Sequence, residues 1–565
     1  MIWVVLALKY LVLLLICLFV LVIFFNRGAG GKINRAALLV LRSGSAAVPE
    51  GKRWELGKGV VLGRSSDCAV SLPDPYVSNR HARIILQDKK YYVTDLGSTN
   101  GTLLENHYLT APQILRNGSQ LQVGGFTLRA DLPEQNQARR SFLLPLFPGL
   151  ILGAGSLELY REQLLSTQDI ALLAVAALFL VVSSFIVEYK GKGDPLIIHI
   201  IGVLSALGLI FIFRVNPYYG LRQAYWVLAG YTLFWLIQIF LSEYRRLLDY
   251  KYTFMVLSIV FLIFTIIFGV EAGGARSWLS LGSFRFQASE FVKVFMVIFL
   301  AGYLEENKEI LRVGTLKFGR FYLPDWPYLG PLLVVCGFSL LLLVFQKDLG
   351  MALLFFVTFL VMVYIATERS YYLLLGLGLF SIGAVLMYYI FPHVQSRILI
   401  YLDPWQQIDG GGYQVVQSLF AISGGGIFGM GLGSGFPKLI PAVHTDFIFS
   451  LIGEELGLLG VMGILGIYYL LVWKGLRISF NAPDGFGSLL ACGFSAILAL
   501  QTLIIVGGVI SVIPLTGIPL PFLSYGGSSF VSNCFLMGIL YKVNAESERD
   551  VDQHGASMRA VEVDR

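Results

Sequence analysis

Asp348 is a carboxylate that lies between two long apolar runs, residues 327–345 and 349–366. Each run is long enough to cross a bilayer as a helix, so the acid falls at or near a membrane boundary. Acidic side chains at such places are costly and usually functional, and a partly desolvated carboxylate can act as a general base. The alternative is an interfacial acid that the neighbouring Lys347 neutralises.

Other charged residues within apolar segments have a structural interpretation. Lys293 follows Glu290 by three residues on an expected helix, so we predict an ion pair between them. Glu454 and Glu455 lie inside the apolar run 446–473. One of these two acids is expected to face a polar interior and pair with a cation.

The composition indicates a polytopic α-helical membrane protein, because 56% of the 565 residues are hydrophobic and only 14% are charged. The net charge of +6 does not indicate a nucleic-acid partner, since the basic residues cluster in short segments between apolar runs. The five cysteines show no CxxC spacing. Neither a disulfide framework nor a metal knuckle is therefore predicted.

Ten apolar runs in residues 195–543 are expected to cross the membrane. The basic residues between them alternate in a way that places both ends of this region in the cytoplasm. The loops at 271–287, 347–349, 392–445 and 512–527 then face outward, and Asp348 lies with them. The ten expected spans are residues 195–213, 224–241, 252–270, 288–304, 327–346, 349–366, 372–391, 446–473, 486–511 and 528–543.

About three further spans are expected before this region. Residues 1–25 resemble an uncleaved anchor more than a signal peptide, because the run is long and no small-residue cleavage site follows it. Residues 131–190 form a linker with two more apolar runs, 142–155 and 170–187. At the other end, residues 544–565 form a charged tail that is predicted to be cytoplasmic.

Residues 36–130 have the composition of a small soluble β domain. Short alternating runs are separated by turn clusters, which is typical of a β-sandwich. Three ordered fragments resemble the forkhead-associated (FHA) family: Gly63-Arg64-Ser65, Ser78-Asn79-Arg80-His81 and Gly97-Ser98-Thr99-Asn100-Gly101-Thr102.

The FHA resemblance implies binding of phosphothreonine peptides. It places Arg64 and Ser78 on the phosphate, Asn79 near it and Asn100 on the peptide backbone, while His81 is expected to brace the loops. An arginine fork and loop hydroxyls suit a dianionic phosphate. The implied partners are a phosphothreonine-bearing cytoplasmic protein and a Ser/Thr kinase. A domain that only packs against a partner is the alternative.

Six ordered blocks of the ten-span region resemble the shape, elongation, division and sporulation (SEDS) family, which includes FtsW, RodA and SpoVE. That family polymerises peptidoglycan glycan strands from lipid II at the outer face of the bacterial cytoplasmic membrane. One departure is Lys347, where the family usually has proline before its acidic residue. The six blocks are GGARSWLSLGSFRFQASEFVK (273–293), QKDLG (346–350), RILIYLDPW (397–405), GYQVVQSLFAISGGGIFGMGLGSG (412–435), HTDFIFSLIGEELGLLG (444–460) and PLTGIPLPFLSYGGSS (514–529).

The SEDS resemblance implies an extracytoplasmic active site with Asp348 as general base. The base would deprotonate an acceptor hydroxyl that attacks an anomeric carbon, and a diphosphate can leave without a catalytic acid if its charge is met. A divalent cation, Mg²⁺ or Mn²⁺, bound with Asp348 could share that work. The candidate substrate-binding residues are Arg276, Arg397, Lys438, Gln414, Gln417, Ser418, His444 and Ser524.

Three functions are compatible with these features. A peptidoglycan glycosyltransferase would use lipid II and the nascent glycan strand as substrates. The alternatives are a lipid II flippase and a non-catalytic scaffold for a class B penicillin-binding protein, the expected transpeptidase partner. A flippase would need polar groups along a route through the membrane. The polar blocks instead gather near one face of the membrane, which favours the enzyme. Asp348 separates the enzyme from the scaffold, because a scaffold does not need it.

Overall fold

The computed structural model describes residues 2–563 except for 29–35, 46, 57–58, 88–89, 116, 133–141, 273–274, 283, 314–315, 319–320 and 324–325. The chain divides into two compact units. One contains residues 1–20 and 141–550, and the other contains residues 21–140 and 551–565.

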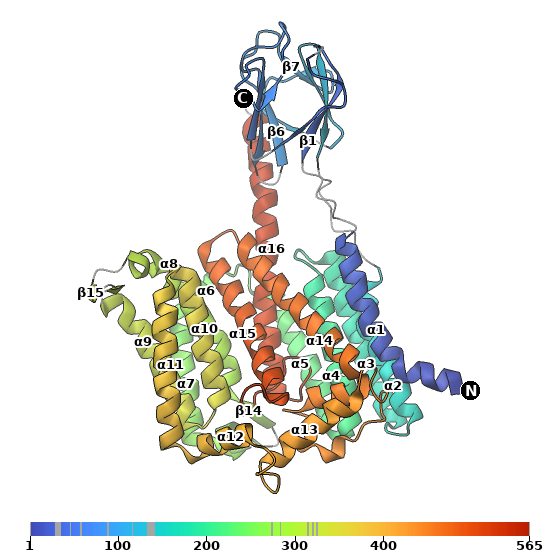
Figure 1. The fold of residues 1–565 in the computed structure, drawn as a ribbon, viewed down its shortest axis with the longest axis vertical. Coiled ribbons are helices and arrows are strands. Elements are labelled where there is room, and N and C mark those ends of the chain that lie inside the picture. Colours follow the sequence, from blue (N-terminus) through green and yellow to red (C-terminus); the bar gives the residue numbers. More distant parts are fainter. Residues whose placement is uncertain are drawn as a thin grey trace. The chain divides into compact units, whose positions relative to one another are not determined.

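The smaller unit contains a β-sandwich of two sheets (Figure 1). One sheet has the strand order β2-β1-β11-β10-β7-β8 and the other has the order β4-β3-β5-β6-β9. The strands are β1 Ala37–Arg42, β2 Arg53–Glu55, β3 Gly59–Gly63, β4 Val70–Ser71, β5 Ala82–Gln87, β6 Lys90–Asp95, β7 Thr102–Leu104, β8 His107–Tyr108, β9 Gln113–Leu115, β10 Gln120–Val123 and β11 Phe126–Asp131.

Alternating side chains from both sheets form the core of the sandwich. In β11, Phe126, Leu128 and Ala130 are fully buried, whereas the residues between them are partly exposed. This period of two is what a strand with one buried face requires. Leu62 and Ile84 from the other sheet complete the same cluster. The predicted β-sandwich is confirmed.

The larger unit is a helix bundle that confirms the predicted polytopic helical architecture. A helix is found at each of the ten predicted spans between residues 195 and 543. The helices that lie wholly or partly in this unit are α1 Ile2–Gly28, α2 Phe147–Arg161, α3 Thr167–Lys190, α4 Leu196–Val215, α5 Pro217–Phe240, α6 Arg246–Asp249, α7 Lys251–Phe268, α8 Ala288–Val313, α9 Trp326–Phe345, α10 Leu349–Thr367, α11 Ser370–Ile390, α12 Pro392–Leu402, α13 Gly412–Gly425, α14 Ile448–Asn481, α15 Gly485–Val509 and α16 Gly527–Val563.

Seven of the described helices are long and apolar enough to cross a membrane, judged by length and composition: α3, α4, α7, α10, α11, α14 and α15. The expected span at 142–155 corresponds to a short 3₁₀ helix, η1 Leu144–Leu146, followed by the 15-residue α2. The spans at 1–25 and 142–155 therefore stay predictions, whereas the run 170–187 lies within α3. Among the ten later spans, those at 224–241, 288–304, 327–346 and 528–543 also stay predictions, because their helices α5, α8, α9 and α16 are not among the seven.

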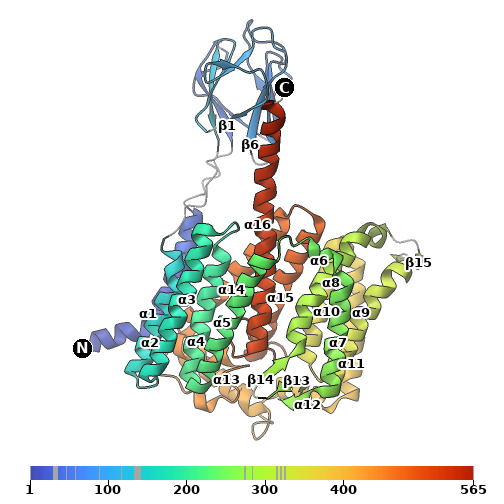
Figure 2. The same cartoon turned by 180° about the vertical axis from the view of Figure 1, so that it is seen from behind.

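The loops that were predicted to share one side of the membrane lie at one end of the bundle. Figure 1 and Figure 2 show the strands β13 and β14 with α12 and α13 at one end, and α6 and β15 at the other. A three-stranded sheet, β12 Val270–Ala272, β13 Ala275–Leu281 and β14 Phe284–Gln287, forms part of the first end. The hairpin β15 Leu316–Phe318 and β16 Phe321–Leu323 belongs to the second.

Part of α1 is packed tightly against the bundle. Ile16 is fully buried, and a Cβ atom at Gly463 of α14 would lie 2.7 Å from its Cγ2 atom. Lys9 Nζ donates a hydrogen bond of 2.7 Å to Ser434 Oγ and lies 3.6 Å from Glu162 Oε1. Residues near the start of the chain thus contact the glycine-rich segment 423–435, more than 400 residues away (the Lys9–Ser434 separation is 425).

Candidate functional site

A cavity of about 1110 Å³ opens at the bundle end that carries β13 and β14. Its walls come from the start of α5, the β13–β14 hairpin, the start of α10, α12, α13, the segment before α14 and the segment between α15 and α16. All six of the sequence blocks, which are distant along the chain, therefore meet here. The lining includes the charged, polar and aromatic residues Tyr219, Arg222, Arg285, Gln287, Asp348, Arg397, His444, Asp446 and Tyr525.

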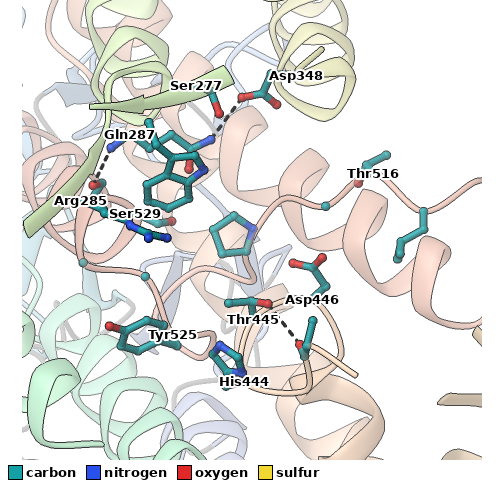
Figure 3. A pocket seen from close by; sticks show the side chains of 18 of the residues that line it. Ser277, Arg285, Gln287, Asp348, His444, Thr445, Asp446, Thr516, Tyr525 and Ser529 are labelled. Carbon is teal, nitrogen blue, oxygen red and sulfur yellow. Dashed lines mark hydrogen bonds between the residues drawn. The ribbon is translucent and has the colours of Figure 1, made fainter. Parts of the chain in front are cut away.

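Asp348 lies in the wall of this cavity with only 6% of its surface exposed. Its Oδ2 atom accepts a hydrogen bond of 3.2 Å from Gln287 Nε2 (Figure 3). The same atom accepts another, of 3.3 Å, from Ser289 Oγ. Its Oδ1 atom accepts from the Met351 backbone N–H at 3.3 Å, so the side chain also caps α10. Burial raises the pKa of Asp348 above its ordinary value, while these hydrogen bonds act in the opposite direction.

The backbone before Asp348 has an unusual conformation. Lys347 has a φ of +59°, in the left-handed region that residues other than glycine seldom adopt. Its N–H donates to the Val344 carbonyl at 2.9 Å. Proline could provide neither this φ nor this hydrogen bond. The departure from the SEDS pattern at this position is therefore consistent with the local backbone.

The cations of the cavity have different neighbours. Arg397 Nη1 donates to the carbonyl oxygens of Leu515 and Thr516 at 3.3 and 3.2 Å. Lys347 Nζ lies 3.7 Å from Glu271 Oε1 in a half-exposed pair. Arg222 lies over the Tyr218 ring, 4.9 Å from its centroid. Positive groups are therefore distributed around the cavity, as a site for a phosphorylated substrate requires.

Aromatic rings form the wall opposite Asp348 and Gln287 (Figure 3). Tyr219 and His444 stack with centroids 4.4 Å apart and an interplanar angle of 7°. The Tyr525 ring lies 5.0 Å from Tyr219, and its backbone N–H donates to the His444 carbonyl at 2.8 Å. Burial lowers the pKa of His444, so the ring is neutral at physiological pH.

Asp446 is a second carboxylate in the cavity wall. Burial raises its pKa to about 6, while Arg397 and a hydrogen bond from Thr445 favour its ionised form. The cavity thus contains two acids, Asp348 and Asp446, whose pKa values are raised by burial. Shifted pKa values are typical of functional sites. Sequence reasoning singled out only Asp348 of the two.

Four of the predicted substrate-site residues line the cavity: Asp348, Arg397, Gln414 and His444. Five lie outside its described lining. Arg276 Nε donates to the Gly269 carbonyl at 2.9 Å, and Ser524 Oγ to the Thr445 carbonyl at 2.6 Å. Ser418 is buried and pairs with Ser450 at 2.7 Å. The remaining two are the exposed Lys438 and the half-buried Gln417.

Arg222, Tyr219 and Tyr525 are the main cavity residues that sequence reasoning did not identify as candidates. The first two were missed because α5 was expected to begin at residue 224, whereas it begins at Pro217. The Asn216-Pro217 pair could have indicated this start. Asn216 accepts a hydrogen bond from the Tyr218 N–H, and proline is favoured in the first helical turn.

Both predicted structural ion pairs are confirmed. Lys293 Nζ lies 2.6 Å from Glu290 Oε2, and both side chains are fully buried. Glu455 Oε1 accepts a hydrogen bond of 3.0 Å from Arg214 Nε and another of 3.1 Å from the Gly435 N–H. Glu455 thus fixes the C-terminal end of the glycine-rich segment 423–435, which leads toward the cavity wall.

The predicted phosphate-binding residues of the β-sandwich lie together in exposed loops. Arg64 Nη2 donates to Asn79 Oδ1 at 3.4 Å, and Ser78 Oγ accepts from the Thr99 N–H at 3.1 Å. Asn100 Nδ2 donates to the Tyr76 carbonyl at 2.8 Å, which ties two of the loops to each other.

His81 braces these loops, as predicted. It is fully buried, its Nδ1 atom accepts from the Ser78 N–H at 3.1 Å, and its Nε2 atom lies 3.1 Å from the Gly101 carbonyl oxygen. Because Nδ1 is an acceptor, the proton belongs on Nε2, where it is donated to that carbonyl. The ring thus connects the second and third FHA fragments.

The fit of a divalent cation depends on the substrate. Among the residues that the structure describes, no three His, Cys, Asp or Glu side chains come together as metal ligands. Mg²⁺ commonly combines one or two carboxylates with substrate phosphate oxygens. Asp348 can supply one carboxylate, so diphosphate oxygens would have to complete the coordination.

A helical membrane unit with a polar cavity at one end, joined to a phosphopeptide-binding type of β-sandwich, defines the class of protein. Residues 194–549 match the model of the FtsW/RodA/SpoVE family of cell cycle proteins, and residues 60–124 match the FHA domain model. The chain therefore belongs to the FtsW/RodA/SpoVE family and carries an FHA domain. It is a multi-pass membrane protein.

Several relatives are similar over most of the helical unit. The peptidoglycan glycosyltransferase RodA of Mycobacterium tuberculosis is 40% identical over 370 residues, covering 63% of this chain and 79% of that protein. The stage V sporulation protein E of Bacillus subtilis is 35% identical over 376 residues, covering 63% and 98%. A solved structure that describes the coordination of polymerization and crosslinking by a peptidoglycan synthase complex matches with 28% identity and a TM-score of 0.53, covering 63% of this chain and 98% of the other.

Proposed function

We propose that the protein is a peptidoglycan glycosyltransferase that polymerises lipid II into glycan strands and releases polyprenyl diphosphate. The observation that carries the proposal is the buried carboxylate of Asp348 in a cavity of about 1110 Å³ at one end of a membrane-spanning bundle. The cavity offers a base, cations and aromatic surfaces, which are the groups that transfer of a lipid-linked sugar requires. The names of the RodA relatives agree with it.

The mechanism begins with binding of two lipid-linked sugars in the cavity. Gln287 and Ser289 hold the Asp348 carboxylate in place by hydrogen bonds. Asp348 accepts the proton of the acceptor 4-hydroxyl as that oxygen attacks the anomeric carbon of the donor. The bond from this carbon to the diphosphate oxygen breaks, and the electron pair leaves with the diphosphate. Direct displacement inverts the configuration at the anomeric carbon.

Cationic side chains and a divalent ion would meet the charge of the leaving group. Arg397 lies in the cavity wall and is oriented by two backbone carbonyls. A Mg²⁺ or Mn²⁺ ion held by Asp348 and the diphosphate oxygens would supply further charge neutralisation. In the part of the chain that the structure describes, no three His, Cys, Asp or Glu side chains come together as metal ligands, so we expect metal to bind strongly only when the diphosphate is present.

The cavity faces the outside of the bacterial cytoplasmic membrane in this proposal, and the FHA domain lies in the cytoplasm. Support comes from the charges at the opposite end of the bundle. Arg245, Arg246, Arg312 and Arg369 gather at the end of the bundle that contains α6 and the end of α8 (Figure 2). An excess of basic residues marks the cytoplasmic ends of membrane helices.

The FHA domain binds a phosphothreonine-bearing cytoplasmic protein in this proposal, and a Ser/Thr kinase controls that binding. Arg64, Ser78, Asn79 and Asn100 stand together on exposed loops where a peptide can reach them. Wall synthesis would then respond to the phosphorylation state of the partner.

A class B penicillin-binding protein is the proposed partner of the helical unit. The similar solved structure concerns a complex that coordinates polymerization and crosslinking, and glycan strands must be crosslinked once they are made. Such a transpeptidase would work next to the cavity from which the strand emerges.

The decisive experiment is polymerisation of purified lipid II by the full-length protein, with and without its cognate transpeptidase. Glycan polymer resolved on a gel is expected. A flippase would instead move labelled lipid II across vesicle membranes without forming polymer, and a scaffold would do neither. Absence of polymer under both conditions would reject the enzyme in favour of one of these alternatives.

A further inference from the structure

The cavity wall at residues 444–446 continues from the glycine-rich segment 423–435. Three glycines of this segment, Gly429, Gly431 and Gly433, have φ values of +80°, +94° and +84°. Glycine loses more conformational freedom than any other residue when its backbone becomes fixed. The segment therefore needs contacts that hold it in place if it is to position the wall that follows it.

The helices of the family region supply a first set of these contacts. Glu455 of α14 accepts hydrogen bonds from the N–H groups of Gly433 and Gly435 at 3.0 and 3.1 Å. Arg214 of α4 donates to the carbonyl oxygens of the same two glycines at 2.9 and 2.8 Å. Both helices lie within residues 194–549, which match the family model.

Helix α1, which precedes the family region, supplies a second set. Lys9 Nζ donates a hydrogen bond of 2.7 Å to Ser434 Oγ. The Lys9 carbonyl oxygen accepts another, of 3.3 Å, from the Leu432 N–H. The Tyr10 hydroxyl donates to the Gly429 carbonyl at 3.2 Å. Helix α1 therefore contacts the glycine-rich segment through its backbone and through two side chains.

Helix α2 packs beside α1 and contacts the same segment (Figure 1 and Figure 2). Glu162, which follows α2, has its Oε1 atom 3.6 Å from Lys9 Nζ. A Cβ atom at Gly433 would lie 3.4 Å from the Glu162 Cγ atom, in ordinary van der Waals contact. At the start of α2, the Phe147 ring lies 5.2 Å from the Phe19 ring of α1. The two helices therefore form a pair, and the end of the pair at Lys9 and Glu162 meets the segment.

An apolar face holds α1 on the bundle. Val12, Ile16 and Phe19 are fully buried. Their spacings of four and three place them on one face of the helix, together with Lys9. Leu14 lies on another face and is 60% exposed. Because apolar burial already docks the helix, the polar contacts of Lys9 act mainly on the glycine-rich segment.

We propose that Lys9 and Tyr10 of α1, together with Glu162 after α2, form a clamp that positions the cavity wall at residues 444–446. The clamp holds the glycine-rich segment, and this segment sets the position of the wall. The inference rests on the proposed glycosyltransferase activity, because it assigns the clamp an effect on substrate binding. The clamp lies outside residues 194–549, so it is an addition to the family region.

The clamp acts on substrate binding more than on the chemical step. His444, a candidate substrate-binding residue, lies in the wall that the clamp positions. Asp348 is instead held by Gln287 and Ser289, which belong to β14 and α8 and not to the glycine-rich segment. Loss of the clamp therefore loosens the binding surface and leaves the base in place.

The first test measures KM and kcat for lipid II polymerisation by full-length variants. Lys9→Met keeps a long unbranched side chain but removes its charge. It should raise KM by about two- to tenfold, because a charge-assisted hydrogen bond at a partly exposed position is lost. The kcat should stay within about twofold, as expected when only binding is weakened. Lys9→Arg keeps a cationic donor and should restore most of the KM, and Leu14→Ala, on the exposed face of α1, is the matched control.

The second test shows whether Lys9 acts through Ser434. Ser434→Ala should raise KM by a similar factor, and the double variant should raise it no further, because the two side chains share one contact. Hydrogen exchange gives a measure that does not depend on activity. Backbone amides of residues 429–446 should exchange faster in Lys9→Met and Ser434→Ala than in Leu14→Ala or the unmodified protein.

Unchanged exchange of residues 429–446 in Lys9→Met would overturn the clamp, whatever the activity. An unchanged KM in Lys9→Met, or KM effects of Lys9→Met and Ser434→Ala that simply add, would also overturn it. If Lys9→Met does not fold, Ser434→Ala decides by the same two measurements. Failure of the unmodified protein to polymerise lipid II, together with faster exchange in Lys9→Met, would reject the proposed function and support the clamp on the wall.

Discussion

At the scale of single residues, Asp348 combines two roles that can be separated. Its Oδ1 atom caps α10 through the Met351 N–H, and its Oδ2 atom faces Gln287 and Ser289. Asparagine caps helices about as well as aspartate. Replacing the acid by its amide therefore removes the basicity and leaves most of the structural role.

Asp348→Asn should lower the rate of lipid II polymerisation by roughly a hundredfold to ten-thousandfold, as expected for loss of a general base. Its thermal stability should stay close to that of the unmodified protein, whereas Asp348→Ala should cost about 1 kcal/mol through loss of the cap. Polymerisation on gels and thermal unfolding check the two effects. Near-normal polymer from folded Asp348→Asn protein would reject the general base.

The pH dependence follows from the same carboxylate. A base works only when it is deprotonated, and burial raises the pKa of Asp348. As the pH falls, kcat/KM should therefore begin to decline at a higher pH than for an ordinary aspartate. Burial raises the pKa of Asp446 to about 6. Its protonation should therefore add a second decline in kcat/KM as the pH falls past that value, and this second decline should be absent in Asp446→Asn. A profile that is flat from pH 4 to 8 would contradict the assignment.

At the scale of elements, hydropathy predicted which segments are helices but not where they end. A helix continues past its apolar part while polar residues keep helical geometry, so α8 runs to Val313 beyond the predicted residue 304. In the same way, α16 runs from Gly527 to Val563, through most of the tail predicted from residue 544. The early start of α5 mattered most, because its first turns carry Tyr219 and Arg222.

The residues of the site were only partly predictable for a related reason. Sequence blocks indicated which loops form the cavity, yet side-chain direction depends on strand register and turn geometry. Arg276 and Arg285 belong to the same hairpin, but Arg285 pairs with Ser280 and lines the cavity, whereas Arg276 donates to the Gly269 carbonyl. No property of the one-dimensional sequence distinguishes these two arginines.

Packing of α1 on α14 predicts the effect of a bulky residue at Gly463. Its Cβ would lie 2.7 Å from the buried Ile16 side chain, so Gly463→Leu should lower stability by about 1–3 kcal/mol or displace α1. Gly466→Leu is the matched control, because a Cβ there meets nothing within 4 Å. Thermal unfolding in detergent measures the difference, and equal midpoints for the two variants would contradict the packing.

At the scale of the whole molecule, the two compact units predict two separable activities. Arg64→Ala should abolish binding of a phosphothreonine peptide, because bidentate charge-assisted bonds dominate such sites. Lipid II polymerisation by the same purified protein should be unchanged. Calorimetry with phosphorylated and unphosphorylated peptide checks the first effect, and undiminished binding by Arg64→Ala would mean that the phosphate site lies elsewhere.

The topology can be tested by labelling in intact cells. Asp409→Cys, in an exposed segment at the cavity end of the bundle, should react with an impermeant thiol reagent. Glu50→Cys, exposed in the β-sandwich, should react only after the cells are permeabilised. Four of the five native cysteines are buried and one is half-buried, so background labelling should be low. The reverse pattern would overturn the proposed sidedness.

The contact between Lys9 and Ser434 also has a consequence for how the protein is made. The two residues are 425 positions apart, and at 5–20 residues per second the ribosome needs roughly 20–90 s to synthesise the chain between them. Throughout that interval Lys9 has been synthesised, while its hydroxyl partner Ser434 does not yet exist. The first helix is therefore made early and docks late, and translation passes through a stage in which this helix exists before the C-terminal segments that it contacts.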